Sequence, residues 1–201
     1  SENNQTKLLL PSVDWISAKI FIDGSFDYGV LSSAIKILGK KNSKSFLINI
    51  GAQIGSTCIP AIKNNYFKNL IAFEPAKKTF RLLKANIFLN GIEDRTKIYN
   101  LALSNKKTNL HLGERIESNI GSSRILSKKQ KNSEIVKSDI LDNYTNGLNR
   151  NNSLIFMDAE GHEPYILLGA KKTLKKRIPI VFEFAPKILD KHWLKNLSIV
   201  F

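Results

Sequence analysis

Two apolar runs, each closed by a distinctive residue, indicate the fold of this chain more strongly than any other feature. Residues 46–50 run into a turn that begins at Gly51 and contains Gly55, and residues 70–73 are followed by Glu74. Glu74 lies about twenty residues beyond Gly51, the spacing at which a strand–turn–helix–strand unit brings a carboxylate beside the ribose of a nucleoside-containing ligand. The sequence therefore predicts a nucleoside site where two neighbouring parallel strands end.

Apolar runs and helical repeats alternate along the chain. We expect strands at residues 46–50, 70–73, 96–103, 154–157 and 180–184, with a shorter one at 19–22. Apolar spacing predicts helices at residues 27–38, 56–64, 75–91, 164–174 and 187–196. Strands that are apolar throughout favour a mostly parallel sheet covered on both faces, so the expected fold class is α/β, doubly wound and Rossmann-like. A last apolar stretch begins at residue 199, and the closing antiparallel strand common in such sheets is not evident.

The length of 201 residues suits a single domain with a sizeable core. We interpret residues 1–45 as an N-terminal arm and helix that pack on the core, and residues 46–201 as the ligand-binding domain. Within it, residues 105–152 are rich in Ser, Asn and Lys, and two short alternating pieces, at residues 109–112 and 134–137, are predicted as small strands. We expect a long, weakly structured insertion there, which in a compact domain is usually functional or mobile.

Charge and composition narrow the classes of partner. The formal net charge of +14 favours acidic partners: nucleic acid, an anionic membrane surface, or a phosphorylated or carboxylated small molecule. The lysines occur as scattered pairs that are not interleaved with aromatic residues, which is typical of a solvated surface. No apolar run approaches the roughly 18–20 residues that cross a bilayer. Cys58, the only cysteine, is expected in the core and fits a reducing, cytoplasmic location.

The glycine turn discriminates between nucleoside ligands. A dinucleotide site needs a second glycine where Gln53 stands, because a side chain there would crowd the pyrophosphate, and no Gly-Lys-Ser/Thr follows to form a P-loop. The turn suits a ligand without phosphate, and S-adenosylmethionine meets that description. Gly51 would let backbone approach its methionyl part, and N–H groups near Ser56 would receive its carboxylate. Gly55 would allow close helix packing, and Glu74 would accept hydrogen bonds from both ribose hydroxyls.

A second group of polar residues follows the apolar run at residues 154–157. Asp158, Glu160 and Glu163 surround a glycine, with His162 among them. Carboxylates grouped where a strand ends are unfavourable unless they bind a ligand or are well solvated. A structural role is also open, since Glu163 would favour the N-terminus of the following helix by about 0.3–1 kcal/mol. These residues fall on the edge of the sheet where the nucleoside is expected.

Taken together, these segments resemble a known family. The chain is similar to the FkbM family of S-adenosylmethionine-dependent methyltransferases over residues 46–186. The resemblance is carried by residues 49–55, Phe73-Glu74-Pro75, Ala102-Leu103-Ser104, residues 158–163 and Leu168-Gly169-Ala170. It implies a class I methyltransferase fold and, most often, O-methylation of sugar-like or other small-molecule hydroxyls.

The resemblance also implies which residues hold the cofactor, S-adenosylmethionine. They are Asn49, Gly51, Ala52, Gln53, Gly55, Ser56, Glu74, Pro75, Ala102 and Leu103. Family members usually carry an acid where this chain has Asn49. The amide removes a negative charge from beside a cationic ligand, which predicts weaker cofactor affinity.

The candidates for a general base come from the second polar group. Methyl transfer from a sulfonium is an in-line displacement, so alignment of the reactants is the enzyme's main contribution. Asp158, Glu160 and His162 could remove the hydroxyl proton, and Asp158 is our first choice because it directly follows a strand beside the expected methyl position. Glu183 could point into the same pocket. We expect no metal, because Asp158 and Glu160 offer two oxygens without a histidine of fixed geometry.

The acceptor is the least defined part of the prediction. Residues 105–152 should shape its pocket, and their lysines and Arg124 favour an anionic small molecule. Two other functions stay open. A non-catalytic binding domain would keep the fold after losing cofactor affinity through Asn49. An RNA methyltransferase fits the charge, but base-amino methylation usually shows an Asn/Asp-Pro-Pro-aromatic segment where this chain has Asp158-Ala159-Glu160-Gly161. The sequence does not predict an oligomeric state.

Overall fold

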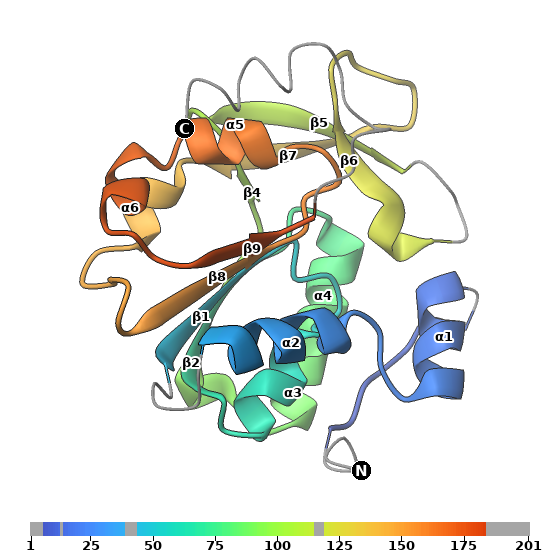
Figure 1. Cartoon of the computed structure of the whole chain (residues 1–201). Helices are drawn as coiled ribbons and strands as arrows, with labels where there is room; N and C mark the ends of the chain where they lie inside the picture. The colour runs from blue at the N-terminus through green and yellow to red at the C-terminus, as the bar shows by residue number, and fades with distance from the viewer. Residues whose placement is uncertain (1–5, 13, 39–43, 115–118, 184–201) are drawn as a thin grey trace.

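In the described part of the chain, five parallel strands form the central sheet (Figure 1). The computed structural model describes residues 6–12, 14–38, 44–114 and 119–183. The strand order is β3-β2-β1-β8-β9. The strands are β1 (Lys44–Ile50), β2 (Phe67–Phe73), β3 (Thr96–Tyr99), β8 (Ser153–Met157) and β9 (Ile180–Phe182). The order reverses between β1 and β8, and doubly wound sheets bind ligands at such a reversal.

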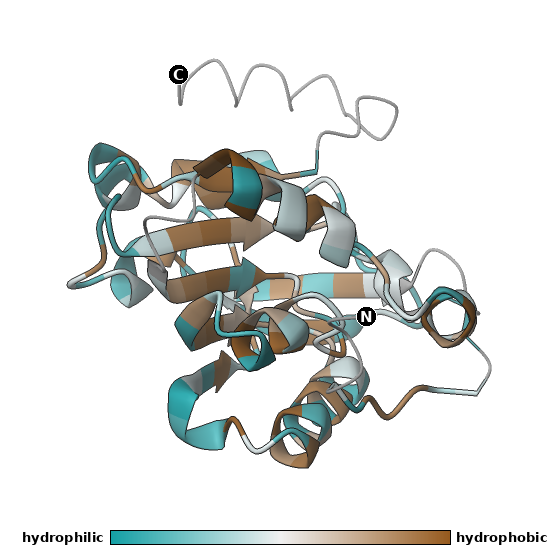
Figure 2. Cartoon of the chain, turned by 60° about the horizontal axis from the view of Figure 1, so that its bottom comes forward, coloured by the Kyte–Doolittle hydropathy of each residue, from teal (hydrophilic) through white to brown (hydrophobic). Residues whose placement is uncertain are grey.

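Both faces of this sheet are buried, because successive side chains of a strand point to opposite sides. In β1, Leu47 packs into one core and Ile48 into the other, and Leu154 and Ile155 of β8 divide in the same way. Full burial of each such side chain contributes about 1.5–3 kcal/mol. In Figure 2, brown, the hydrophobic end of the scale, recurs along the central strands. The apolar runs that predicted buried parallel strands are confirmed.

Two groups of helices cover the two faces of the sheet (Figure 1). One face carries α2 (Tyr28–Leu38), α3 (Cys58–Lys63) and α4 (Lys77–Leu89). The other carries α5 (Glu163–Leu168) and α6 (Lys171–Lys175). Three helix predictions need correction: α3 and α4 are shorter than residues 56–64 and 75–91, and the helix expected over residues 164–174 is interrupted at Gly169. The covering of both faces confirms the doubly wound α/β fold.

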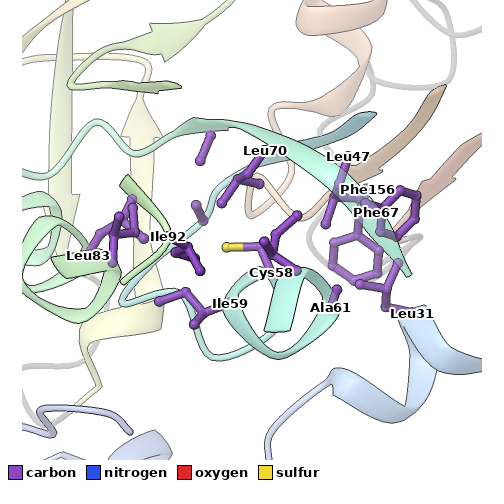
Figure 3. Close-up of a cluster of buried hydrophobic side chains, with 14 of the residues drawn as sticks. Leu31, Leu47, Cys58, Ile59, Ala61, Phe67, Leu70, Leu83, Ile92 and Phe156 are labelled. Atoms are coloured by element: carbon purple, nitrogen blue, oxygen red, sulfur yellow. The ribbon is translucent and has the colours of Figure 1, made fainter. Parts of the chain in front are cut away.

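Cys58 begins α3 inside the core beneath α2, α3 and α4. Its sulfur lies among Ile59, Leu70 and Ile92 in Figure 3, and the side chain is fully buried. Burial raises the pKa of the thiol to about 12. The expectation of a core cysteine is confirmed.

A second sheet stands where the sequence predicted a weakly structured insertion. It consists of β4 (Ala102–Leu103), β5 (Thr108–Glu114), β6 (Ser123–Leu126) and β7 (Glu134–Asp139), in the order β4-β7-β5-β6. β5 pairs antiparallel with β6 and β7, and β4 pairs parallel with β7. The alternating pieces predicted at residues 109–112 and 134–137 belong to β5 and β7. β6 has no counterpart in the prediction, because a strand of only four residues between serines shows no clear apolar pattern.

The prediction of one strand over residues 96–103 is wrong. The segment divides after Tyr99 into β3, in the parallel sheet, and β4, in the second sheet. At the crossing, Asn100 Nδ2 donates to the backbone oxygens of Glu74 and Pro75, at 2.9 Å each. This side chain fixes the passage between the two sheets beside the end of β2.

A helix also stands where residues 19–22 were predicted to form a strand. α1 (Trp15–Asp23) begins at Asp14, whose Oδ2 accepts from the N–H of Ser17 at 2.7 Å. It ends at Gly24, which has φ 76° and donates its N–H to the carbonyl of Ile20 at 2.8 Å. The two caps explain the error, because a side-chain cap and a left-handed glycine stop favour a helix over a short polar–apolar alternation.

The remaining segments bear on the site only indirectly. The arm before α1 runs along α4, where the N–H of Lys7 donates to Asn90 Oδ1 at 3.0 Å. The helix predicted at residues 187–196 and the strand at 199–201 lie outside the described residues. Within the described ranges, no helix has the length and apolar character needed to cross a membrane.

Candidate active site

The glycine turn after β1 is held tightly against the end of β8. Gly51 has φ 75°, and a Cβ there would lie 1.7 Å from the carbonyl oxygen of Asp158. The N–H groups of Gly51 and Ala52 both donate to the carbonyl of Phe73, at 3.0 and 2.9 Å. Gly51 therefore allows the turn after β1 to pack closely against the backbone of Asp158. The sequence had suggested that it allows the backbone to approach a ligand. Any side chain would displace β8 from β1.

Glu74 turns its carboxylate toward this turn. Its Oε2 accepts from the N–H of Gln53 at 2.9 Å, and its Oε1 accepts from the N–H of Ala76 at 2.9 Å. Gln53 reaches this position with φ 49°, a left-handed conformation uncommon for a residue other than glycine. Burial raises the pKa of Glu74 to about 7, against the two backbone hydrogen bonds that lower it. Each carboxylate oxygen keeps a second lone pair for a ligand.

A cavity of about 570 Å³, including open solvent at its mouth, lies above this carboxylate. Its apolar lining comes from Phe73, Pro75, Leu101, Leu103 and Ile166. Of the residues predicted to hold cofactor or to act in catalysis, it brings together Gly51, Gln53, Glu74, Pro75, Ala102, Leu103, Asp158, Glu160 and His162.

A smaller cavity of about 270 Å³ lies on the other side of the glycine turn. Asn49, Ala52 and Ser56, three further predicted residues, line it together with Asp27. The sequence placed Asp27 only at the start of the helix predicted over residues 27–38, and in the structure it precedes α2 with φ 56°. Its place in the site depends on how the N-terminal segment packs, which no local pattern predicts. Gly55 lines neither cavity; a Cβ there would lie 2.5 Å from Ile59 Cδ1, so its lack of a side chain serves helix packing.

Two buried oxygens at this smaller cavity accept no hydrogen bond from any described residue. They are Oδ1 of Asn49 and Oδ1 of Asp158. Asn49 is 2 % exposed, and its Nδ2 donates to the carbonyl of Phe156 at 3.4 Å. Buried acceptors without donors are unfavourable unless a ligand supplies the donor. The cavity therefore suits a group that carries N–H or positive charge.

A cluster of acids surrounds Asp158. Burial, followed in decreasing order by the carboxylates of Glu183, Glu160, Glu163 and Asp27, raises its pKa to about 8. Glu163 is 1 % exposed, and its Oε1 accepts from the N–H of Ala159 at 2.8 Å. Like charges that cannot all ionise favour a cationic ligand, because a positive charge relieves their mutual repulsion. The sulfonium and ammonium of S-adenosylmethionine would supply that charge.

His162 lies beside the larger cavity in a fixed orientation. Its Nε2 is 3.0 Å from Ser104 Oγ, and its ring stacks on Tyr165 with centroids 4.9 Å apart. Burial lowers its pKa to about 4, so the imidazole is neutral near pH 7 and carries a free lone pair, although it is a weaker base than an exposed histidine. Sequence reasoning did not assign Ser104 a role, because its partner lies 58 residues away.

Gly169 explains how Ser104 is positioned. A Cβ at Gly169 would lie 2.1 Å from the carbonyl oxygen of Ser104. The backbone that follows β4 thus packs against the break between α5 and α6. The Leu168-Gly169-Ala170 segment therefore has a packing role that holds Ser104 under His162.

The second sheet supplies one wall of the larger cavity. Leu112, Ser123 and Ile125 of β5 and β6 line it, together with Gly121. A Cβ at Gly121 would lie 2.8 Å from Gln53 Nε2, so this wall touches the glycine turn. Among the residues that the structure describes, no group of three or more His, Cys, Asp or Glu side chains is arranged to hold a metal ion.

This Rossmann-like fold, with a glycine turn after its first strand and an acid after its second, is shared with solved class I, S-adenosylmethionine-dependent methyltransferases. A family model described as the methyltransferase FkbM domain matches residues 49–197. The chain therefore belongs to the FkbM methyltransferase family, as its sequence segments predicted, and its cofactor is S-adenosylmethionine.

Two solved structures show the same fold. Methyltransferase FkbM from Methylobacillus flagellatus KT has a TM-score of 0.52 and 14 % identity, over 78 % of this chain and 36 % of that one. The methyltransferase domain of METTL16 has a TM-score of 0.51 and 12 % identity, over 97 % of this chain and 64 % of that one. The chain thus spans about a third of the length of the FkbM structure. A search of curated proteins finds no significant match.

Proposed function

We propose that this chain transfers a methyl group from S-adenosylmethionine to a hydroxyl oxygen of a small, sugar-like molecule. The observation that carries the proposal is the convergence of the glycine turn and Glu74 on one cavity that His162 also lines. Binding groups and a neutral base thus lie around the same space.

The side chains around the two cavities fit this cofactor. Glu74 offers lone pairs to the ribose hydroxyls, and Pro75, Leu101 and Leu103 form an apolar slot of the kind that an adenine ring fills. The unpartnered oxygen of Asn49 suits the ammonium group. When bound, the cofactor supplies a methyl group activated by a sulfonium charge.

His162 is the general base of this proposal, although the sequence favoured Asp158. Asp158 lines both cavities around the glycine turn and stands among acids, so its role is to hold positive charge. The Ser104 hydroxyl lies 3.5 Å from Asn105 Oδ1, and by donating there it leaves its own oxygen to accept from Nε2–H of His162. Nδ1 then carries the lone pair that removes the acceptor's proton, which contributes typically 10²–10⁴-fold.

Each predicted segment of the chain has its own role in the proposal. Residues 46–201 form the catalytic domain of the proposal, and residues 105–152 supply the wall that selects the acceptor. Residues 1–45 are more than a packing arm, because Asp27 lines the cavity beside Asn49. Removal of this segment would open that cavity.

Thermal unfolding with S-adenosylhomocysteine, the product that keeps the nucleoside and carboxylate, tests cofactor binding. A ligand at 100 times its Kd adds about 2.7 kcal/mol to the free energy of unfolding. For a chain of this length that raises the Tm by about 5–10 °C. Glu74→Gln should lose most of the rise, measured against its own ligand-free Tm, because an amide replaces one acceptor oxygen by a donor.

Glu93→Gln, at an exposed turn before β3, is the matched control and should keep the full rise. Two outcomes would contradict the proposal: a native chain whose Tm ignores the ligand, or equal rises in the native chain and Glu74→Gln. The first would also leave a non-catalytic domain as the better description.

A further inference from the structure

A groove of about 1330 Å³, including open solvent, adjoins the cofactor cavity. One side consists of residues 124–128 and Gln130, from β6 and the segment after it. The other consists of residues 160–162 and Tyr165. Ile125, Glu160 and His162 line both the groove and the cofactor cavity. The groove therefore leads directly to the proposed base.

Charge is unevenly distributed along the groove. Among the described residues that line it, the cations are Arg124 and Lys128, both on the β6 side, and neither lines the cofactor cavity. The carboxylate among these residues, Glu160, stands where groove and cavity meet. Neither cation forms an ion pair with a described residue. An anionic group is therefore favoured at the outer part of the groove and disfavoured near the cofactor.

The wall opposite the cations is aromatic. The rings of His162 and Tyr165 lie within 19° of parallel, with centroids 4.9 Å apart. Ile125 and Leu126 of β6 also line the groove. Aromatic and apolar side chains with a few polar groups are typical of small-molecule sites, and this pair offers a flat surface for a ring. His162 thus combines a packing surface with the proposed base.

We infer that this groove binds the methyl acceptor, and that the acceptor is a ring-bearing hydroxy compound carrying an oxyanion. The oxyanion, a phosphate or a carboxylate, is held by Arg124 and Lys128. Guanidinium suits either group, because its planar donors match two oxygens at once. A ring on the Tyr165 side then directs a hydroxyl toward His162. This inference rests on the proposed function, since it places the second substrate of the same reaction.

A single anionic group fits better than a nucleic acid. A protein that tracks a nucleic-acid backbone neutralises several phosphates along its path, each adding to the salt dependence of binding. The groove offers two cations, set four positions apart at one end. That arrangement suits one phosphate or carboxylate on a small molecule.

Calorimetric titration of the chain saturated with S-adenosylhomocysteine tests the inference. The probes are inorganic phosphate, glucose 6-phosphate, glucuronate and, as the uncharged comparison, glucose. We expect at least one ring-bearing anion to bind at least about tenfold more tightly than glucose, since a charge-assisted hydrogen bond contributes that much. The phosphorylated and carboxylated probes show which oxyanion the site prefers. Raising the salt concentration should weaken their binding and leave that of glucose unchanged.

Arg124→Gln and the pair Arg124→Gln with Lys128→Gln should each remove this preference. Lys97→Gln, an exposed lysine in β3 at the far edge of the parallel sheet, should keep it. The Tm rise with S-adenosylhomocysteine should be intact in all three variants, because none of these residues lines the cofactor cavity.

Three results would overturn the inference: no charged probe binds more tightly than glucose, both groove variants bind the anions as tightly as the native chain, or an oligouridine RNA binds more tightly than any small anion. With the Tm rise intact, the first two results leave the proposed function standing, whereas the third would also replace its small-molecule acceptor by RNA. If S-adenosylhomocysteine does not raise the Tm of the native chain, both the proposed function and this inference are wrong.

Discussion

The two sheets of this molecule differ in how deeply their side chains are buried. β8 is buried at every position, and both of its faces meet packed cores. β7 alternates between buried and exposed, and Ile135 on its outer face is 57 % exposed. The core beside the second sheet is a small cluster around Ala102, Leu112 and Val136. The parallel sheet therefore tolerates little change, whereas the second sheet can vary on one face.

This difference matches the proposed division of labour. Glu74, Gly51 and Asp158 stand at strand ends of the parallel sheet, where close packing fixes their positions. Arg124 and Ile125 stand on β6, the edge strand of the second sheet. A cofactor shared by a whole family suits the rigid sheet, and an acceptor that differs between members suits the thinner one. Four predictions test this contrast.

The largest contrast concerns two glycines. Gly51→Ala places a Cβ 1.7 Å from the backbone of Asp158 at a φ of 75°, so we expect a loss of more than about 3 kcal/mol in the free energy of unfolding. Gly113→Ala, in β5, meets Leu126 Cδ1 at 2.6 Å, and that flexible side chain can move, so about 1 kcal/mol is expected. Urea unfolding measures both. Equal losses of unfolding free energy would show that the two sheets are equally intolerant of an added side chain.

The second prediction concerns two histidines. His162→Ala should lower the rate of S-adenosylhomocysteine release with an accepted hydroxyl compound by about 100-fold or more, because the proposed base is lost. Its Tm rise with S-adenosylhomocysteine should persist. His111→Ala, in β5 of the second sheet, is the matched control and should leave the rate within about twofold. A rate that survives His162→Ala would return Asp158 to the place of the base.

The third prediction is a pH dependence of the ligand-free fold. The pKa of Asp158 rises from 3.8 to about 8 on folding, so the folded state holds a proton that the unfolded state releases. This contribution to stability is full below about pH 4 and is lost as pH rises toward 8. The native chain should therefore lose stability relative to Asp158→Asn across that window. Urea midpoints measured from pH 4 to 8 check it.

Asp94→Asn, in the exposed turn before β3, should follow the native chain at every pH. Parallel curves for the native chain and Asp158→Asn would mean that the acid cluster around Asp158 does not hold its proton.

The smallest effect is expected at the hydroxyl that holds the base. Ser104→Ala removes the 3.0 Å contact to His162 Nε2. The loss of one hydrogen bond of about 1 kcal/mol should slow methyl transfer, measured as S-adenosylhomocysteine release, roughly fivefold. Ser133→Ala, whose hydroxyl lies 3.5 Å from His111 Nδ1 in the second sheet, should have no effect on the rate. Equal slowing in the two variants would remove the positioning role of Ser104.

The same contrast governs what the sequence could predict. Strands buried on both faces are continuous apolar runs, so β1, β2 and β8 were predictable from residue type alone, and the half-buried β9 is an apolar run as well. The spacing of Gly51 and Glu74 predicted their convergence, because a strand–turn–helix–strand unit is a local structure. The second sheet is half exposed, so the alternating pattern predicted only parts of β5 and β7, and the segment around them was interpreted as a weakly structured insertion.

Contacts between segments that are distant in the sequence could not be predicted from it. The neighbour that makes a side chain impossible at Gly51 is Asp158, and the partner of His162 is Ser104. Asp27 reaches the smaller cavity through the packing of α2, which the helical spacing predicted without its location. Such pairs depend on the complete topology, and no periodicity in one segment encodes them.

Cys58 gives this chain a built-in probe of its own opening. A thiol-specific reagent reacts with thiolate, and a thiol that is fully buried with a pKa of about 12 presents almost none at neutral pH. The rate at which such a reagent labels the protein therefore reports how often α3 separates from the sheet beneath it. Because the sequence contains no other cysteine, that rate can be followed in mixtures and compared across every variant described above.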